Sequence, residues 1–323
     1  MLPRVGAGLH LSGLRVTVGP PDRRVTAVDG IDLSVAPGEV VAVVGESGCG
    51  KSTLLRAVCG LLPRDATLEG TLAWDGTPLP APGDPGWAAL RREVLGVVFQ
   101  EPGEALNPTR RIANQVIEAL PPLPRARRKA AAAALLARAG FPEPEAVLGA
   151  YPHALSGGQR QRILAALALA RDPALLLADE PTAHLDPTLA AQLLEVLFRG
   201  PGPAAPPTPS ADRAALWVTH DLAWAARLAT RVDVMYAGRV VERGPARAVL
   251  EAPRHPYTAG LVAAVPRPGR ELAPIPGAPP SLLSPPAGCR FHPRCPRATE
   301  RCAQVRPEWR AGVACHHPLE APR

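Results

Sequence analysis

The feature that most constrains the fold is a glycine-rich turn between a short apolar strand and a helix. Residues 40–44 are all apolar and predict a buried strand, and the turn that follows has the spacing G-x-x-x-x-G-K-S. Its glycines let backbone N–H groups converge on phosphate oxygens, and the helix adds positive potential at its N-terminus. We expect Lys51 to contact the terminal phosphates of a nucleotide and the Ser52 hydroxyl to bind Mg²⁺. The expected nucleotide-binding residues of this loop are Gly45, Glu46, Ser47, Gly48, Cys49, Gly50, Lys51, Ser52 and Thr53.

Two carboxylates follow a second apolar strand. The run Leu175–Ala178 predicts a buried strand, and it ends in Asp179 and Glu180. Asp179 is placed to hold Mg²⁺, directly or through water, and Glu180 to polarise an attacking water as general base. Two acids after a strand say little alone, but together with the phosphate-binding loop they predict nucleotide hydrolysis.

The order of the expected elements indicates the fold class. It predicts an α/β fold with a mostly parallel sheet covered on both faces, an antiparallel edge from the early strands, and a helical subdomain inserted at about residues 101–171. Strands are expected within 9–44 and at 94–99, 175–178 and 216–218, helices at 50–60, 112–120, 126–139, 157–170, 187–198 and from 221, and a surface loop at 200–210.

A second glycine-containing turn precedes the helix expected at 157–170. Ser156 supplies a hydroxyl, and Gly157 and Gly158 lack Cβ atoms, so this turn is a second site for an anion. A chain that binds one nucleotide needs only one phosphate-binding turn. The second turn is therefore expected to bind the nucleotide of a facing subunit. Its residues are Leu155, Ser156, Gly157, Gly158 and Gln159.

With these two turns, residues 9–265 resemble the ATP-binding-cassette (ABC) ATPases, P-loop NTPases in which two cassettes sandwich two ATP molecules. The resemblance implies that Gln100 is the Q-loop glutamine, which touches the metal and senses the membrane partner. It further implies that Asp186 is the D-loop aspartate and that His220 is the switch histidine at the γ-phosphate. ATP and Mg²⁺ are then the ligands, with metal contacts from Ser52, Gln100 and Asp179 and catalysis by Glu180 and His220.

Two positions depart from the pattern of this family. Residues 1–44 contain no Phe, Tyr or Trp, and Val18 lies near the place of the usual adenine-stacking aromatic residue. Weakened stacking predicts poor discrimination between ATP and GTP. His184 replaces a common alanine before Leu185 and Asp186, and it is either an inert surface residue or one that makes communication between cassettes pH-sensitive.

The chain after Tyr236 resembles one branch of the family, the importers of oligopeptides, dipeptides and nickel, whose ATPases carry a stretch similar to His255-Pro256-Tyr257-Thr258. The expected division is an ABC ATPase domain in residues 1–265 and a C-terminal extension in residues 266–323, which begins with a proline-rich connector. The resemblance implies ATP-driven dimerisation that energises import of peptides or related solutes. The implied partners are a second ATPase subunit, usually a paralogue, two transmembrane permease subunits and, indirectly, a solute-binding protein.

Four of the six cysteines lie in this extension, with the spacing C-x5-C-x6-C-x12-C. A reducing cytosol disfavours disulfides, so the four are candidate metal ligands. Four thiolates suit Zn²⁺ or an iron–sulfur cluster. The lack of a C-x-x-C pair argues against a zinc ribbon, and similarity to the branch favours a [4Fe–4S] cluster, with zinc and unmetallated thiols as the alternatives. The candidates are Cys289, Cys295, Cys302 and Cys315, whereas Cys49 and Cys59 are not expected to be ligands.

Composition bears on location and partners. The chain has no run of 18 or more uninterrupted apolar residues and no signal-peptide pattern at its N-terminus, so we expect it at the cytoplasmic face of the cell membrane, bound peripherally. Residues 265–323 hold nine arginines and four glutamates out of a net charge of +7, which indicates a solvated basic tail and no nucleic acid as partner. The alternatives are an ABC ATPase of another transporter class or of DNA repair, but no long coiled coil or zinc module interrupts residues 51–156.

Overall fold

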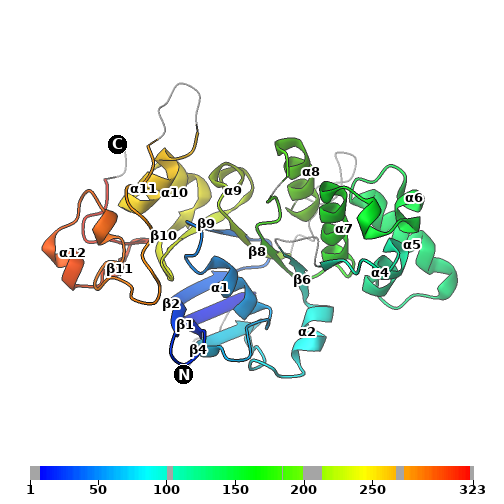
Figure 1. The fold of residues 1–323 in the computed structure, drawn as a ribbon, viewed down its shortest axis with the longest axis horizontal. Helices are drawn as coiled ribbons and strands as arrows, with labels where there is room; N and C mark the ends of the chain where they lie inside the picture. Colours follow the sequence, from blue (N-terminus) through cyan, green and yellow to red (C-terminus); the bar gives the residue numbers. More distant parts are fainter. Residues whose placement is uncertain (1–7, 100–104, 184, 199–212, 267–272, 321–323) are drawn as a thin grey trace. The chain divides into compact units, whose positions relative to one another are not determined.

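The computed structural model describes residues 8–99, 105–183, 185–198, 213–266 and 273–320. Contacts group the chain into two compact units (Figure 1). The first unit combines residues 1–84 with residues 218–323, and the second consists of residues 85–217. The N-terminal part of the chain and its C-terminal extension therefore belong to the same unit.

An antiparallel sheet of four strands forms the N-terminal part of the first unit, in the order β2-β1-β4-β5. Strand β1 pairs with β2 on one side and with β4 on the other, and Leu9, Leu14 and Val16 on β1 are fully buried. The antiparallel subdomain expected from the early strands is thus a separate sheet. Their bounds are β1 (Leu9–Val18), β2 (Val25–Val35), β4 (Thr67–Trp74) and β5 (Thr77–Pro78).

The remaining strands of the first unit have the order β11-β12-β10-β9-β3. Strands β3 and β9 are parallel, and β9, β10, β12 and β11 follow as antiparallel neighbours. Glu242 on β10 pairs with Val313 on β12, so the extension adds two short strands to this sheet. The strands are β3 (Val40–Val44), β9 (Arg231–Tyr236), β10 (Arg239–Pro245), β11 (Trp309–Arg310) and β12 (Val313–Ala314).

Short helices complete the first unit. Helix α1 starts directly after the phosphate loop, and Asp221 caps α9 by accepting from the N–H groups of Ala223 and Trp224. The helices are α1 (Lys51–Val58), α9 (Leu222–Leu228), α10 (Ala246–Glu251), α11 (Pro256–Ala263) and α12 (Glu300–Gln304), with a 3-10 turn at His292–Arg294.

The second unit joins three strands to a cluster of helices (Figure 1). Its strands lie in the order β8-β7-β6, and β6 and β7 are parallel. The helices share an apolar core that includes Ile112, Leu136 and Ile163, each fully buried. The strands are β6 (Leu95–Val98), β7 (Leu175–Asp179) and β8 (Ala214–Thr219, of which the first four residues belong to this unit), and the helices are α2 (Trp87–Glu93), α4 (Ile112–Ala119), α5 (Arg125–Arg138), α6 (Pro144–Gly149), α7 (Gly157–Leu169) and α8 (Pro187–Phe198), with a 3-10 turn at Pro152–Ala154.

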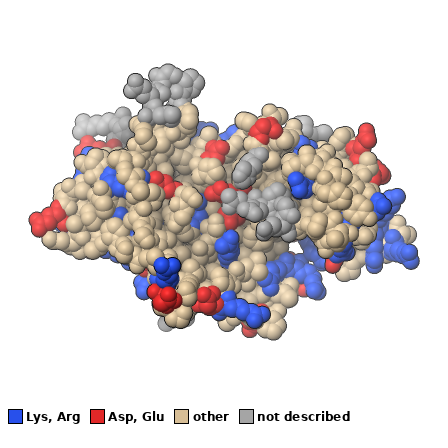
Figure 2. All heavy atoms as spheres, viewed as in Figure 1, with Lys and Arg blue, Asp and Glu red and all other residues tan. Residues whose placement is uncertain are grey.

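Basic side chains gather at the first turn of α5, as Figure 2 shows. Arg125, Arg127, Arg128 and Lys129 are all exposed. Positive charge at a helix N-terminus opposes the helix dipole, so propensity and tertiary packing must hold this end of α5 in place. Leu135 and Leu136 supply that packing from the buried face of the helix.

The expected elements are present with bounds that differ by one to three residues, and α8 occupies 187–198 as expected. The loop expected at 200–210 lies almost wholly in 199–212, outside the described residues. Across the described ranges, no helix is both long and apolar enough to cross a membrane.

Gly96 on β6 provides a stability test of the second unit. A Cβ added there would lie 2.4 Å from the carbonyl oxygen of Ala168 and 2.6 Å from Cγ of Pro173. We expect Gly96→Ala to lower the free energy of unfolding by about 1–3 kcal/mol, because neither contact can yield without moving backbone or ring. Urea denaturation measures the change. Gly149→Ala is the matched control, since a Cβ at Gly149 meets nothing within 4 Å, and an equal loss in both variants would contradict this account.

Candidate nucleotide-binding site

The phosphate loop is a tight turn between β3 and α1 in the first unit. Only glycine fits at Gly45 and Gly50, because a Cβ would lie 2.1 Å from the carbonyl oxygen of Met235 at the first and 2.0 Å from that of Ala27 at the second. Lys51 begins α1 and is buried, and its ammonium group donates to the carbonyl oxygens of Gly45 at 2.9 Å and Glu46 at 3.0 Å. The loop thus has the compact backbone that anion binding by N–H groups requires.

Two residues from the C-terminal part of the chain hold the start of this loop. The Tyr257 hydroxyl accepts a hydrogen bond from the backbone N–H of Glu46 at 2.8 Å. The Arg294 guanidinium donates to both carboxylate oxygens of Glu46, at 2.6 and 2.9 Å. This fork-to-fork geometry is the strongest form of ion pair between side chains. Main chain and side chain of Glu46 are therefore both fixed by residues more than 200 positions away.

An aromatic cluster supports these two contacts. The rings of Tyr236, Tyr257 and Phe291 pack at centroid distances of 4.5 to 5.3 Å, and the Arg294 guanidinium lies about 6 Å from two of them. Hydrogen bonds to Glu46 raise the pKa of Arg294 above its usual range, and burial raises the pKa of Tyr257. Arg294 therefore stays charged and Tyr257 stays protonated at neutral pH.

The segment His255-Pro256-Tyr257-Thr258 positions Tyr257 at the start of α11. His255 is the N-cap, and its Nδ1 accepts a hydrogen bond from the N–H of Tyr257 at 3.0 Å. Burial lowers the pKa of His255 to about 3, which keeps the ring neutral and able to accept. The Glu242 carboxylate accepts from the N–H groups of Arg254 and His255. In the sequence this segment is only a family likeness, whereas in the structure it positions the hydroxyl that contacts the phosphate loop.

The expected switch histidine belongs to the first unit. His220 is exposed and lies directly after β8, one residue before α9. The hydroxyl of Thr219 accepts from the N–H of Asp221, which shapes the backbone around the histidine. Gln100 and His184 lie outside the described residues.

The two expected acids end β7 in the second unit. Asp179 is buried, and Glu180 has a φ of +43°, a left-handed conformation that is unusual for a residue other than glycine. Such backbone strain is typical of functional positions, where the surrounding structure holds it in place. Gln161 on α7 is buried and donates from Nε2 to the carbonyl oxygen of Pro181 at 2.7 Å, so it ties α7 to the residues after Glu180. Gln161 was not among the predicted site residues, and its only signal in the sequence is its place two residues after the signature turn.

The signature turn caps α7. The Ser156 hydroxyl accepts from the N–H of Gln159 at 3.3 Å, and the Gln159 side chain accepts from the N–H of Ser156 at 2.9 Å, a reciprocal capping box. A Cβ at Gly158 would lie 2.8 Å from Cδ1 of Leu189, so this glycine serves packing against α8. A Cβ at Gly157 would meet nothing within 4 Å. Gly157 is therefore the part of the turn that a group from outside can approach.

Asp186 has a structural role of its own. Its Oδ1 accepts from the N–H groups of Thr188 and Leu189, both at 3.0 Å, at the start of α8. An aspartate that accepts these two bonds stabilises the N-terminus of the helix.

The four cysteines of the extension border one small pocket, together with His255 and His292. Burial raises the pKa of Cys289 to about 11, and the three other thiols act in the same direction. Within the residues that the structure describes, no group of three or more His, Cys, Asp or Glu side chains is arranged to hold a metal ion. The donor set fits a four-thiolate centre, but the side chains do not form one as they stand.

The glycine-rich loop between β3 and α1, the acids after β7 and the capped turn before α7 define a P-loop nucleotide-binding protein. The ABC transporter family model matches residues 28–183, and that of the oligopeptide/dipeptide transporter C-terminal region matches residues 241–302. Together with the relatives described next, these matches show that the chain belongs to the ABC transporter family of ATP-binding proteins.

The relatives are ATP-binding proteins of peptide transport. The dipeptide transport protein DppD of Bacillus subtilis is 40% identical over 93% of this chain and 90% of its own length. The oligopeptide transport protein OppD of Escherichia coli is 39% identical, over 97% and 94%. OppD of Mycobacterium tuberculosis is 45% identical over 93% of this chain, which spans about half (49%) of that relative's length.

Solved structures agree on the fold. The dimeric bacterial ABC transporter cassette MJ0796 matches with a TM-score of 0.64 and 27% identity, over 74% of this chain and 99% of the cassette. A post-hydrolysis state of the same cassette, bound to ADP and Pi, matches with a TM-score of 0.63, 26% identity and the same coverage. The expected P-loop fold of an ABC nucleotide-binding domain is therefore confirmed.

The ion pair at Glu46 yields a test of the phosphate loop. Arg294→Met keeps an unbranched apolar stem but removes the guanidinium and leaves the Glu46 carboxylate without its partner, so we expect ATP affinity to fall by about 5–30-fold, equivalent to about 1–2 kcal/mol. Equilibrium titration with ATP measures this change. Arg301→Met, at an exposed position on α12, is the control and should bind as the parent does.

A double-mutant cycle separates this pair from general damage. Glu46→Gln removes the negative charge that pairs with Arg294. The loss of ATP affinity in the double variant should therefore be smaller than the sum of the losses in the two single variants. Additive losses would contradict a direct coupling.

Proposed function

We propose that this chain is an ATP-hydrolysing subunit that energises the import of peptides or related solutes across the cytoplasmic membrane. The observation that carries the proposal is the presence in one chain of two anion-binding turns, the phosphate loop and a signature turn whose Gly157 is open to an outside group. The names of the relatives support peptides as cargo, and the match at residues 241–302 supports the same branch.

The proposed mechanism assigns a role to each group. ATP and Mg²⁺ bind at the phosphate loop, where Lys51 contacts the phosphates and Ser52 the metal. Glu180 acts as general base on the attacking water, and His220 contacts the γ-phosphate. Asp179 and Gln100 complete the contacts to the metal, and residues 155–159 together with Asp186 serve the nucleotide of a facing subunit.

The proposed assembly needs other chains. Two nucleotide-binding subunits close on ATP and reopen after hydrolysis, and two transmembrane permease subunits convert this motion into transport of a solute supplied by a binding protein. The dimeric cassette MJ0796 supports the first part of this arrangement. The chain would sit at the cytoplasmic face of the membrane, with its ATPase domain in residues 1–265 and the extension in residues 266–323.

The rival function, DNA repair, lacks structural support. Repair ATPases of this class insert long coiled coils or zinc modules into the cassette. The longest helix among the described residues is α5, with 14 residues, which belongs to a helical core rather than a coiled coil.

Glu180→Gln tests the chemistry. Removal of the general base should lower the ATP turnover rate by about 100–10,000-fold, while binding of ATP persists because the phosphate loop is unchanged. Steady-state hydrolysis and equilibrium ATP binding measure the two effects. Glu195→Gln, on helix α8, is a matched control at a surface-facing position.

The same Glu180→Gln variant tests the assembly. In the presence of Mg-ATP and its companion subunit it should accumulate as a dimer, since hydrolysis no longer reopens the pair. A variant that stays monomeric under these conditions contradicts the two-turn account. Copurification with two polytopic membrane proteins supports transport, whereas stimulation of the ATPase by DNA supports the rival.

We further propose that Cys289, Cys295, Cys302 and Cys315 hold a [4Fe–4S] cluster, with Zn²⁺ as the alternative. Their shared pocket and the mutual effect of the thiols on the pKa of Cys289 support a common centre. When bound, the metal group would cross-link four points of the extension through metal–thiolate bonds.

Metal content tests this assignment. The chain purified without oxygen should contain about four iron atoms and absorb as a brown sample. Cys302→Ala should lose this iron, whereas Cys59→Ala should keep it, because Cys59 is buried in the segment after α1 and is not among the thiols of the shared pocket. Zinc without iron would establish the alternative, and a chain with neither metal would refute a metal centre.

A further inference from the structure

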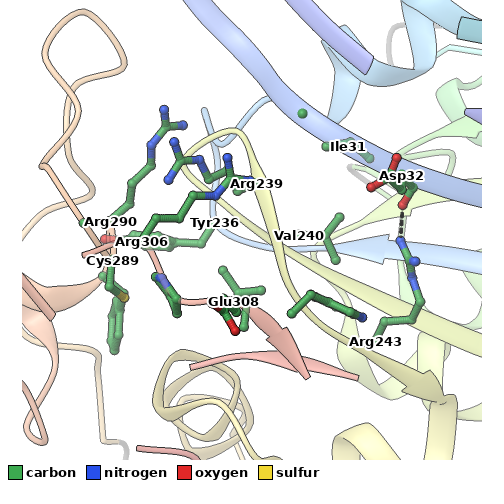
Figure 3. A pocket seen from close by; sticks show the side chains of 17 residues that line it. Ile31, Asp32, Tyr236, Arg239, Val240, Arg243, Cys289, Arg290, Arg306 and Glu308 are labelled. Atoms are coloured by element: carbon green, nitrogen blue, oxygen red, sulfur yellow. Dashed lines mark hydrogen bonds between the residues drawn. The ribbon is translucent and has the colours of Figure 1, made fainter. Parts of the chain in front are cut away.

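A cavity of about 530 Å³ lies in the first unit between strands β2 and β10 and the C-terminal extension. Its volume is within the range of small-molecule sites. None of the expected nucleotide-binding residues borders it, and Cys289 alone of the four pocket cysteines does. Figure 3 shows the side chains around it, with Arg239, Arg290 and Arg306 gathered on one side and Arg243 near Asp32 on the other.

The lining carries more positive than negative charge. Four arginines and two acids border the cavity, and the two acids have other partners. Oδ1 of Asp32 accepts from the N–H of Gly13, and the Glu308 carboxylate pairs with Arg310 at 2.6 Å. The lining therefore has a formal excess of two positive charges, four minus two.

One carboxylate beneath the cavity is shared among three arginines. Asp29 pairs with Arg290 at 2.6 Å, with Arg239 at 2.7 Å and with Arg15 at 3.0 Å. Arg290 is buried and is committed to this carboxylate and to the carbonyl oxygen of Ala237. A single charge of −1 does not balance three guanidinium groups, so this pairing leaves positive potential at the cavity wall.

Arg306 is exposed and differs from the other three arginines of the lining, which have ion pairs. Within the described part of the chain its guanidinium makes neither an ion pair nor a hydrogen bond, and its Nη2 would lie at an ordinary contact distance, 3.9 Å, from a Cβ added at Gly30. Burial and the charge of Arg239 lower the pKa of Arg306, and burial and Arg239 lower the pKa of Arg290 to about 10. The charge of Arg239 contributes to both shifts after burial, and an anion in the cavity would relieve that part of the repulsion.

The rest of the lining is apolar. Ile31 and Val241 are buried beneath the cavity, and Trp309 borders it with 45% of its surface exposed. The Arg243 guanidinium lies 5.5 Å from the Trp309 ring, which fixes the orientation of the indole. An apolar body in the cavity would cover these surfaces.

We propose that this cavity is a binding site for a small organic carboxylate with an apolar or aromatic body, held by Arg306 and Arg239 at its charged end and by Trp309 at its apolar end. A carboxylate accepts two parallel hydrogen bonds from a guanidinium, so the arginines of the lining suit a carboxylate ligand. The carboxylate that binds belongs either to a free acid or to the C-terminus of a short peptide. The site goes beyond the proposed transport function and does not depend on it.

Calorimetric titration of the purified full-length chain tests the proposal. The probes are 3-phenylpropionate, its amide, the dipeptide Ala-Phe, Ala-Phe amide and inorganic phosphate. At least one acid should bind about tenfold or more tighter than its own amide, because the amide removes the charge-assisted bonds. Binding of Ala-Phe assigns a peptide terminus as the source, and binding of phenylpropionate alone assigns free acids. The proposal is overturned if the acids bind no more tightly than their amides, if neither acid binds, or if phosphate binds as tightly as the acids.

Variants locate the site. Arg306→Met and Trp309→Ala should each weaken binding of the acid by about tenfold. Arg247→Met is the matched control, because Arg247 is exposed on helix α10 and does not border the cavity. Unchanged ATP binding and an unchanged unfolding midpoint show that each variant is folded. Parental affinity in both folded variants overturns the assignment.

Discussion

The phosphate loop is held in place by an ion pair between residues 248 positions apart. Arg294 is almost completely buried, and a buried charge costs several kcal/mol unless a partner meets it with good geometry. Glu46 provides that partner, and the carbonyl oxygen of Pro276 takes the remaining Nε–H at 2.8 Å. Because Tyr236 and Tyr257 pack around the pair, the extension, the strand β9 and the loop form one structural unit around the first turn of the nucleotide site.

The second unit uses short-range hydrogen bonds for the same purpose. Ser156 and Gln159 satisfy each other's backbone N–H groups, and Asp186 does so for the start of α8. Gln161 then joins α7 to the segment after β7, so the signature turn and Glu180 are linked through one helix. The Gln161 bond is buried whereas the Ser156, Gln159 and Asp186 bonds are exposed. A buried polar group without a partner costs about 1–3 kcal/mol, so the Gln161 bond restricts the backbone more than the exposed bonds do.

Local patterns in the sequence predicted most of the central helices and strands, but they did not predict the long-range contacts. The periodicity of residues 157–170 and 187–198 predicted α7 and α8 nearly to the residue, since apolar faces and caps are local signals. Strand β4 was missed because its burial pattern is mostly exposed, and β11 and β12 because they have two residues each. The motifs predicted a set of nucleotide-binding residues, whereas Arg294 carries no signal in its own neighbourhood and Tyr257 had only a family likeness.

A glutamate next to the phosphates of a polyanionic ligand is unfavourable unless a cation neutralises it. Here the cation comes from the extension, so the acidic residue and the extension depend on each other. In a homologue without the extension, the Glu46 carboxylate would lie beside the phosphates of ATP with no cation to neutralise it. Natural selection would then favour a neutral residue at this position. The two positions should therefore vary together among homologues, in spite of their separation along the chain.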